Sequence, residues 1–307
     1  MIYSFIEEHR GLYRVKKMCE VLQVSTSGYY KWREKVQSDM QKIKEGALRS
    51  IQLIFYENRE VYGSPRIHRE LKKMGVVLSV KTVANYMREL GLCATVPFQY
   101  TVTTQSNHEH PIYPNLLKRK FHADHPNQAW VVDITYIWTS EGWLYLATVM
   151  DLFSRKIIGF NLANTLSKEL PQLALERAFH FRSPKEGLIH HSDQGSQYAS
   201  KDYISLLKKN RCKISMSRKG DCYDNACIES FHATIKKELI YRRKFKTRKE
   251  AEAVVLEYII SFYNERRSHS TLNYVSPNMF EAMYEHQSRK KSTQQPLITF
   301  VEEQLSL

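Results

Sequence analysis

Three acidic residues stand in three different contexts, and their types and spacing suit phosphoryl-transfer chemistry. Asp133 interrupts an apolar segment, Asp193 follows the segment LIHHS, and Glu229 lies on an amphipathic segment. One compact domain can gather three carboxylates at this spacing. Hard divalent cations such as Mg²⁺ prefer oxygen ligands. Two such ions ~3.5–4 Å apart can stabilise both the attacking and the leaving oxygen of a displacement at phosphorus. The pattern therefore predicts a two-metal site.

Each acid also has a structural interpretation. A lone Asp133 in a buried strand is more often bonded to backbone amides or to an arginine, because an uncompensated buried charge is costly. Glu229 could be a surface acid near Lys236, which contributes little to stability. In the functional interpretation Glu229 holds a metal ion, Asn225 orients Glu229 or contacts the substrate DNA, and Lys236 contacts the DNA backbone. The presence of all three acids favours this second interpretation.

The neighbours of these acids extend the predictions. His190 and His191 are left out of the metal set, because hard-metal phosphoryl chemistry prefers oxygen and their position suits packing or substrate contact equally well. The turn-rich segment SRKGDCYDNA is expected to be a mobile loop over the site, with Asp224 as the N-cap of the helix that carries Glu229.

Composition bounds the partners and the compartment. The chain has 307 residues and a formal net charge of +14, so a polyanion is expected as its partner. No apolar run reaches the roughly 18 residues of a membrane span, and the first residues do not form a signal peptide. We therefore expect no membrane partner and a cytoplasmic location. The 5 cysteines include no C-x-x-C pair, so reduced thiols are expected, and no structural zinc or other bound cofactor besides the metal ions.

The elements that precede the acids are predicted to be paired short helices. Pro65 is a favoured first helical residue, and Ser79 is a favoured N-cap. Such pairs resemble helix-turn-helix DNA readers, although any small helical bundle has the same periodicity. On the last helix Lys81, Asn85 and Arg88 share one side and are the predicted DNA contacts. The expected helices are Val15–Leu22, Thr26–Trp32, Pro65–Met74 and Val80–Leu90.

The elements around the acids predict an α/β domain. Three β-prone segments separated by turn residues are expected to pair antiparallel. A helix, a short strand and another helix follow, which is the order of a ribonuclease-H-like core. The strands are Ala129–Trp138, Trp143–Asp151, Lys156–Leu162 and Gly187–His191, and the helices are Leu166–Phe181 and Lys201–Asn210.

The expected organisation has six parts. Two helical segments that resemble helix-turn-helix units come first, a Pro-rich linker that could lie along DNA follows, and a catalytic core, a helical extension and a flexible tail complete the chain. The respective boundaries are 1–37, 38–93, 94–128, 129–245, 246–286 and 287–307.

Several segments together resemble one protein family. The acids lie in WVVDITYI, HSDQGSQY and KGDCYDNACIESF, followed by IKKEL and a YNxxRxHxxLxYxSP pattern. CEVLQVSTSGYYKWR, YGSPRIHRELKKMG and MDLFSRKIIGF extend the match over nearly the whole chain. This sequence is similar to the second-reading-frame product of insertion-sequence-3 family transposases.

The resemblance implies a retroviral-integrase-like core in which Asp133, Asp193 and Glu229 form the acidic triad. It further implies two Mg²⁺ ions, for which Mn²⁺ can substitute. Cleavage at element ends and joining of the freed 3′-OH to a new phosphate are the implied reactions. Double-stranded DNA, both terminal repeats and target, is the implied partner, bound by a homo-oligomer.

One departure limits this expectation. Relatives often act as fusions with an upstream product that supplies a further helix-turn-helix and a leucine zipper, and this chain shows no heptad run at its start. Two alternatives remain at this point. A noncatalytic DNA-binding relic or regulator would not require all three acids, and a generic ribonuclease-H-like nuclease would not require the basic N-terminal region.

Overall fold

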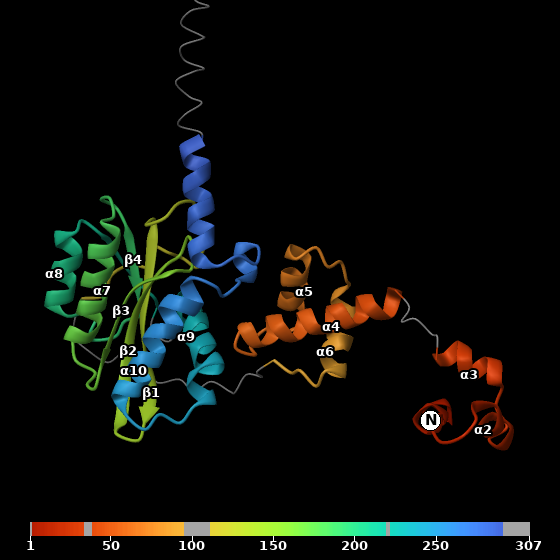
Figure 1. Ribbon diagram of the computed structural model, residues 1–307. Coiled ribbons are helices and arrows are strands. Elements are labelled where there is room, and N and C mark those ends of the chain that lie inside the picture. Colours follow the sequence, from red (N-terminus) through yellow and green to blue (C-terminus); the bar gives the residue numbers. More distant parts are fainter. Residues whose placement is uncertain (1, 34–38, 95–110, 219–221, 291–307) are drawn as a thin grey trace, which may run out of the picture. The chain divides into compact units, whose positions relative to one another are not determined.

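The computed structural model describes residues 2–33, 39–94, 111–218 and 222–290 (Figure 1). The chain divides into two compact units. The first comprises Met1–Glu57 and Tyr62–Cys93, and the second comprises Asn58–Val61 and Ala94–Leu307. The six boundaries predicted from sequence are finer than this division and remain predictions.

The first three helices enclose a small apolar cluster. They are α1 (Ile2–His9), α2 (Val15–Val21) and α3 (Thr26–Arg33). Ile6, Cys19 and Tyr29 are buried at its centre, and the Tyr29 hydroxyl donates to the Glu7 carboxylate. The last two helices match the predicted pair closely.

The next three helices are α4 (Asp39–Glu57), α5 (Ser64–Lys73) and α6 (Val80–Glu89). Proline lies in the first turn of α5, and Ser79 caps α6 by accepting a hydrogen bond from the Thr82 amide at 3.0 Å. After α5 the chain turns at Gly75, whose φ of 81° is unfavourable for residues with a side chain. The buried apolar residues of the pair are Ile67 and Leu71 on α5 and Val83 and Met87 on α6.

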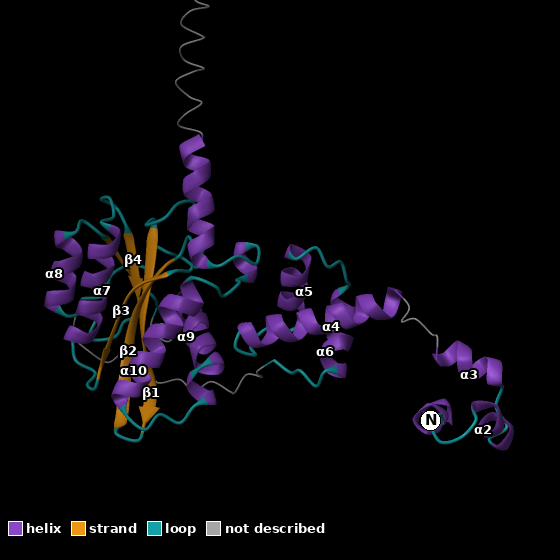
Figure 2. Ribbon diagram, viewed as in Figure 1, coloured by secondary structure: helices purple, strands orange, loops and turns teal. Residues whose placement is uncertain are grey.

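The second unit is built on a five-stranded sheet with the order β3-β2-β1-β4-β5 (Figure 2). The first three strands form an antiparallel meander, and β4 and β5 run parallel to β1. The strands are β1 (Ala129–Thr139), β2 (Gly142–Asp151), β3 (Ile157–Ala163), β4 (Ile189–Ser192) and β5 (Lys213–Met216). This is the predicted ribonuclease-H-like arrangement, with β5 as an additional strand.

Helices cover both faces of the sheet (Figure 1). On one face, α7 (Glu169–Arg182) and α8 (Lys201–Lys209) share an apolar core with Trp130 and Val132 of β1. A Cβ on Gly159 of β3 would lie 2.3 Å from the Ala174 carbonyl oxygen, so only glycine permits this approach of α7. On the other face lie α9 (Ala226–Glu238) and α10 (Arg248–Glu257).

The described part of the predicted linker, residues 111–128, lies against the core. The backbone amide of Leu116 donates to the Ser215 hydroxyl at 2.9 Å, and the side-chain amide of Asn115 donates to the Asp224 carboxylate at 2.9 Å. Leu117 is buried. This part has no helix or strand, as expected, and the hydrogen bonds of Asn115 and Leu116 join it to the core. That the linker lies along DNA stays a prediction.

The C-terminal elements complete the second unit. A π-helical segment, η3 (Tyr258–Asn264), continues α10, so the hydrogen-bonding pattern of this helix changes at Tyr258. Short 3₁₀ turns are η1 (Cys222–Asn225), η2 (Ile240–Arg242) and η4 (Ser270–Leu272). A final helix covers 277–290 and so includes 287–290 of the predicted flexible tail, whereas 291–307 lie outside the described residues.

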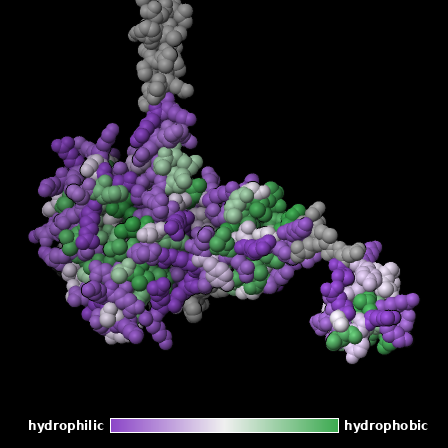
Figure 3. All heavy atoms as spheres, in the orientation of Figure 1, coloured by the Kyte–Doolittle hydropathy of each residue, from purple (hydrophilic) through white to green (hydrophobic). Residues whose placement is uncertain are grey.

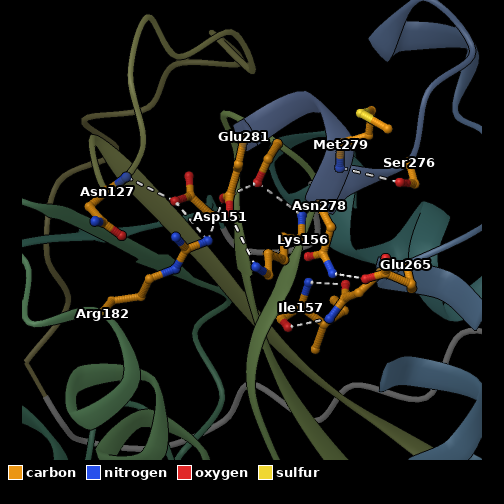
Figure 4. Close-up of polar contacts among 12 residues, drawn as sticks. Asn127, Asp151, Lys156, Ile157, Arg182, Glu265, Ser276, Asn278, Met279 and Glu281 are labelled. Carbon is orange, nitrogen blue, oxygen red and sulfur yellow. Dashed lines mark hydrogen bonds and ion pairs between the residues drawn. The ribbon is translucent and has the colours of Figure 1, made fainter. Parts of the chain in front are cut away.

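A buried polar cluster attaches this final helix to the sheet (Figure 4). Arg182 of α7 lies between Asp151 of β2 and Glu281 of the final helix. The Glu281 carboxylate also accepts from Lys156 at 3.2 Å and from the Ser154 hydroxyl at 2.6 Å. Burial raises the pKa of Asp151 to about 6. These residues lie outside the predicted site and join three elements.

Within the described ranges, no helix combines the length and the apolar character needed to cross a lipid bilayer. Hydrophilic side chains predominate on the face of the core that Figure 3 shows.

Candidate active site

Asp133 and Asp193 are brought together by two neighbouring parallel strands. In the register of β1 with β4, Val131 is opposite His191. Asp133 lies two residues after Val131, and Asp193 lies two residues after His191. If the register continues, Asp133 and Asp193 are therefore opposite each other. Successive side chains of a strand alternate between faces, and residues two apart share one. The sheet therefore directs Asp133 and the start of the loop after β4 to the same region.

The loop that carries Asp193 is held by hydrogen bonds. The Gly195 amide donates to Asp193 Oδ1 at 2.9 Å, and the Ser192 hydroxyl donates to the Asp193 carbonyl at 2.8 Å. The Gln194 side chain donates to the Ser217 carbonyl after β5 at 2.9 Å. Asp193 is half-buried, so its carboxylate is positioned and still accessible.

Glu229 is placed by two contacts with β1, one from the residue before α9 and one from α9 itself. The side-chain amide of Asn225 donates to the Val132 carbonyl at 3.1 Å, and His232 Nδ1 lies 3.1 Å from Asp133 Oδ2. Residues three and four apart lie on one face of a helix. Glu229 falls between these two anchors and therefore faces the same strand.

The three acids lie close enough to one another to interact electrostatically. Burial, with the charges of Asp133 and Asp193, raises the pKa of Glu229 to about 7. Burial is also the main cause of a raised pKa at Tyr136, with Asp133 and Asp193 contributing. Like charges must lie close to shift a pKa in this way. The structure therefore brings together all three predicted acids.

The donor set suits a hard divalent cation. Mg²⁺ commonly takes one or two carboxylates and completes its shell with water and phosphate oxygens. A cation would also relieve the repulsion that raises the pKa of Glu229. Among the described residues, however, no group of three His, Cys, Asp or Glu side chains is gathered closely enough to hold an ion by itself.

Lys236 and Asn225 have different surroundings, although both were predicted to contact DNA. Lys236 is half-buried one turn beyond His232; burial lowers its pKa, and Asp133 opposes this shift. Asn225 is buried, and its amide donates to β1. The structure thus corrects the predicted DNA contact of Asn225, because this residue is buried against the sheet, while its part in orienting Glu229 remains a prediction.

Asp224 also differs from its predicted role. The N-cap position of α9 is Asn225, without a side-chain cap. The buried Asp224 carboxylate instead accepts from Arg119 Nε at 3.0 Å and from Arg218 Nε at 3.1 Å. The Arg218 hydrogen bond is the main cause of the strongly lowered pKa of Asp224. Part of the predicted mobile loop, 219–221, lies outside the described residues.

His190 and His191 have packing roles. His190 Nε2 lies 3.0 Å from the Tyr203 hydroxyl, and His191 Nδ1 lies 2.8 Å from the Ser215 hydroxyl. Burial lowers the pKa of His190 to about 3 and that of His191 to about 4. Both rings are therefore neutral at pH 7 and lie inside the core.

The helix-turn-helix-like segment presents the other predicted contacts. Lys81, Asn85 and Arg88 are all exposed on α6, opposite its buried Val83 and Met87. Arg88 donates to the Asn85 side chain at 3.1 Å. Their common side of α6 is available to a partner.

Sequence reasoning missed His232 and Thr148, which contact each other and Asp133. His232 was assigned only to the polar side of its helix. Its spacing of three residues from Glu229 was a usable signal, whereas Thr148 is found only through the pairing of β1 with β2.

Comparison with known proteins identifies the family of the chain. Residues 123–222 and 210–277 match two family models described as an integrase core domain, and residues 42–100 match one described as an HTH-like domain. The transposase InsF for insertion sequence IS3A of Escherichia coli (strain K12) is 40% identical over 283 residues, covering 92% of this chain and 98% of that protein. The chain belongs to the insertion-sequence-3 transposase family.

Another relative of the present chain is an insertion element IS600 uncharacterized 31 kDa protein of Shigella sonnei. It is 42% identical over 267 residues, covering 87% of this chain and 98% of that protein. Among solved structures, the HTLV-2 integrase catalytic core domain in complex with magnesium aligns with a TM-score of 0.40 and 14% identity, covering 52% of this chain and 99% of that one.

Proposed function

We propose that this transposase cuts and joins DNA at the ends of an insertion sequence by phosphodiester transesterification, as an Asp-Asp-Glu type polynucleotidyl transferase. The observation that carries the proposal is the shared site of Asp133, Asp193 and Glu229, in which the two aspartates help to raise the pKa of Glu229 to about 7. Family membership supports the same activity.

In this mechanism the three carboxylates would hold two Mg²⁺ ions, with Mn²⁺ as a substitute. When bound, such a pair of ions supplies an activated attacking oxygen and stabilises the leaving oxygen. Asp133 would present its oxygens from within β1, Asp193 from the loop directly after the neighbouring β4, and Glu229 from α9. Lys236 contributes a positive charge beside Asp133, where a phosphate of the DNA backbone can be bound.

DNA recognition is assigned to the exposed side of α6. Lys81, Asn85 and Arg88 are proposed to contact the terminal repeats, while the net charge of +14 attracts both repeat and target DNA. Joining two element ends needs more than one catalytic site, so we expect a homo-oligomer on DNA. The upstream reading-frame product, alone or as a fusion, is a further proposed partner. Because DNA is the substrate, the expected location stays cytoplasmic.

The test is a Mg²⁺-dependent nicking and strand-transfer assay on a labelled duplex that carries the element end. Glu229→Gln keeps the shape of the side chain and removes its charge, so product formation is expected to fall by at least about 100-fold. Glu252→Gln removes the same charge from an exposed position on α10 and is the matched control. It is expected to behave as the wild type.

Equal activity of wild type and Glu229→Gln contradicts the proposed site. If the wild type binds DNA but forms no product, the assay is repeated with the upstream reading-frame product. Activity restored by that addition supports the proposal with a required partner. Continued inactivity favours the alternative function, a noncatalytic regulator that occupies the terminal repeats.

A further inference from the structure

His232 links the candidate catalytic strand to its neighbour. Asp133 on β1 is opposite Thr148 on β2. The ring of His232, from α9, bridges both residues: Nδ1 lies 3.1 Å from Asp133 Oδ2, and Nε2 lies 2.8 Å from Thr148 Oγ1. Thr148 and His232 are both buried. Three elements thus meet at one imidazole.

The partners of the ring determine where its proton lies. An ionised carboxylate only accepts hydrogen bonds, so Nδ1 is the nitrogen that donates to Asp133. In the neutral ring Nε2 is then an acceptor. The Thr148 hydroxyl lies 2.8 Å from Nε2 and 3.4 Å from the Asp133 carbonyl oxygen, so the nearer Nε2 is the acceptor for its proton. Thr148 therefore favours the tautomer that His232 needs in order to donate to Asp133.

These contacts fix the orientation of the Asp133 carboxylate. Its Oδ1 accepts from the Ile134 amide at 2.8 Å, while Oδ2 accepts from His232. The Asp133 side chain remains 22% exposed. Since each carboxylate oxygen has a second lone pair, both can still bind a cation from the open side.

We propose that His232 is a positioning residue for Asp133, held in the donating tautomer by Thr148. This inference rests on the proposed function, in which Asp133 is a metal ligand. A hydrogen bond to a ligating carboxylate limits its rotation, and loss of such an outer partner typically costs about 10- to 100-fold in metal affinity or activity. The competing explanation is that His232 only fastens α9 to the sheet.

Two amide variants separate these explanations. In His232→Asn the amide nitrogen can occupy the place of Nδ1 and donate to Asp133. In His232→Gln the longer side chain places its amide near the position of Nε2 and leaves Asp133 without its donor. His232→Phe keeps the ring volume without hydrogen bonds, and Thr148→Val removes only the hydroxyl. Thermal unfolding shows which variants remain folded.

Two readouts are used on the full-length protein. One is the Mg²⁺ concentration dependence of strand transfer, and the other is Mn²⁺ binding without DNA, measured by electron paramagnetic resonance. We expect His232→Gln and His232→Phe to lose about 10- to 100-fold in both. His232→Asn is expected to stay within a few-fold of wild type, and Thr148→Val to lie between.

The proposal is overturned if the asparagine and glutamine variants are equally impaired and their losses of activity and ion affinity follow their melting temperatures. His232 then only attaches α9 to the sheet. Full ion affinity in His232→Phe overturns it as well. If His232→Phe fails to fold, the comparison of the two amides still decides. A wild type that binds no Mn²⁺ and joins no DNA overturns the proposed function itself.

Discussion

Glu229 shows how the fold brings together charges that repel. Its carboxylate lies near Asp133 and Asp193, and burial with their charges raises its pKa to about 7. The helix cannot relax away from the strand, because Asn225 and His232 join it to β1 on either side of Glu229. The unfavourable interaction is therefore built into the site, and a bound divalent cation would offset it.

For the metal-free protein, this interaction predicts that Glu229→Gln is stabilising above pH 7. The folded pKa lies above the ordinary 4.5, so the folded state holds an extra proton between these values and stability falls as pH rises through them. The neutral glutamine avoids this loss. A gain on the order of 1 kcal/mol is expected at pH 8, allowing for solvent screening of a half-buried group, and almost none near pH 4. Urea unfolding in chelator at both pH values measures it; an equal gain at both would contradict the electrostatic origin.

The surroundings of Asp224 stabilise its charge, whereas those of Glu229 oppose it. The buried Asp224 carboxylate accepts hydrogen bonds from Asn115, Arg119 and Arg218. Asp224→Asn is expected to cost about 1.5–3 kcal/mol at pH 7, the usual contribution of hydrogen bonds to a charged group. Because the folded pKa lies below the ordinary 3.8, this contribution is present above that value and is lost as pH falls below it. Chemical unfolding at pH 7 measures the difference.

The control for this comparison is Asp202→Asn. Asp202 is an exposed residue of α8 that pairs with Lys168 at 2.6 Å. Exposed ion pairs contribute little, so a change below about 1 kcal/mol is expected. Similar losses in both variants would show that burial of Asp224 is not what makes its contacts stabilising.

At the residue scale, the sequence predicted the three acids and not their supports. Asp133 was visible because it interrupts an apolar segment, Asp193 because it follows the segment LIHHS, and Glu229 because it lies on an amphipathic segment. Asp224 was assigned to a cap because local sequence favours that role, whereas its partners are an arginine from the predicted linker and another after β5. Contacts between distant segments leave no local periodicity, so sequence patterns could not reveal them.

At the scale of elements, α9 is held at both ends. Its N-terminal part contacts β1, and near its C-terminus Glu238 pairs with Arg267, whose guanidinium donates at 2.7 and 2.8 Å. The Tyr258 hydroxyl donates to the same carboxylate at 2.6 Å. Arg267, which had no assigned role from sequence, is 5% exposed. It therefore faces the core.

Arg267→Met is expected to destabilise the second unit by about 3–5 kcal/mol, because it leaves the Glu238 charge buried without its partner. Adding Glu238→Gln removes that charge, so the double variant is expected to recover part of the loss. A double-mutant cycle by chemical denaturation gives the coupling energy. Strictly additive losses would mean that the two side chains stabilise the protein independently.

Long elements were predicted well, and short or context-dependent ones were not. The strands β1 to β3 have enough alternating and apolar residues to be recognised, and Pro65 and Ser79 mark helix starts. The four residues of β5, Lys213–Met216, are too few for a periodic signal. Residues 111–128 contain the prolines typical of a linker, yet their side chains and amides bind the core.

At the scale of the whole molecule, charge and sequence order together define a DNA enzyme. The HTH-like segment at 42–100 precedes the integrase core segments at 123–222 and 210–277. The net charge of +14 acts on any DNA without regard to sequence. Preference for element ends must therefore come from particular side chains, and α6 presents the candidates. Composition predicted the class of partner, but it cannot indicate which surface reads the sequence.

The last prediction tests that assignment with Lys81→Ala combined with Arg88→Ala. Both residues are exposed, so folding should be unchanged. If they contact phosphates, affinity for the element end falls and the slope of log K against log salt decreases by nearly 2, since each contact contributes about 0.9. If they contact bases, the preference for element ends over unrelated duplex is lost instead.

Lys208→Ala combined with Lys209→Ala is the matched control, because it removes the same charge from exposed positions on α8. Titrations at several salt concentrations, with specific and unrelated duplexes, separate the contributions. A control pair that weakens binding as much as the α6 pair would show that only overall charge matters. A loss of DNA affinity that is confined to the α6 variant and is greatest for the element end would assign recognition to the helix-turn-helix-like segment. The acidic site would then act in catalysis and not in recognition.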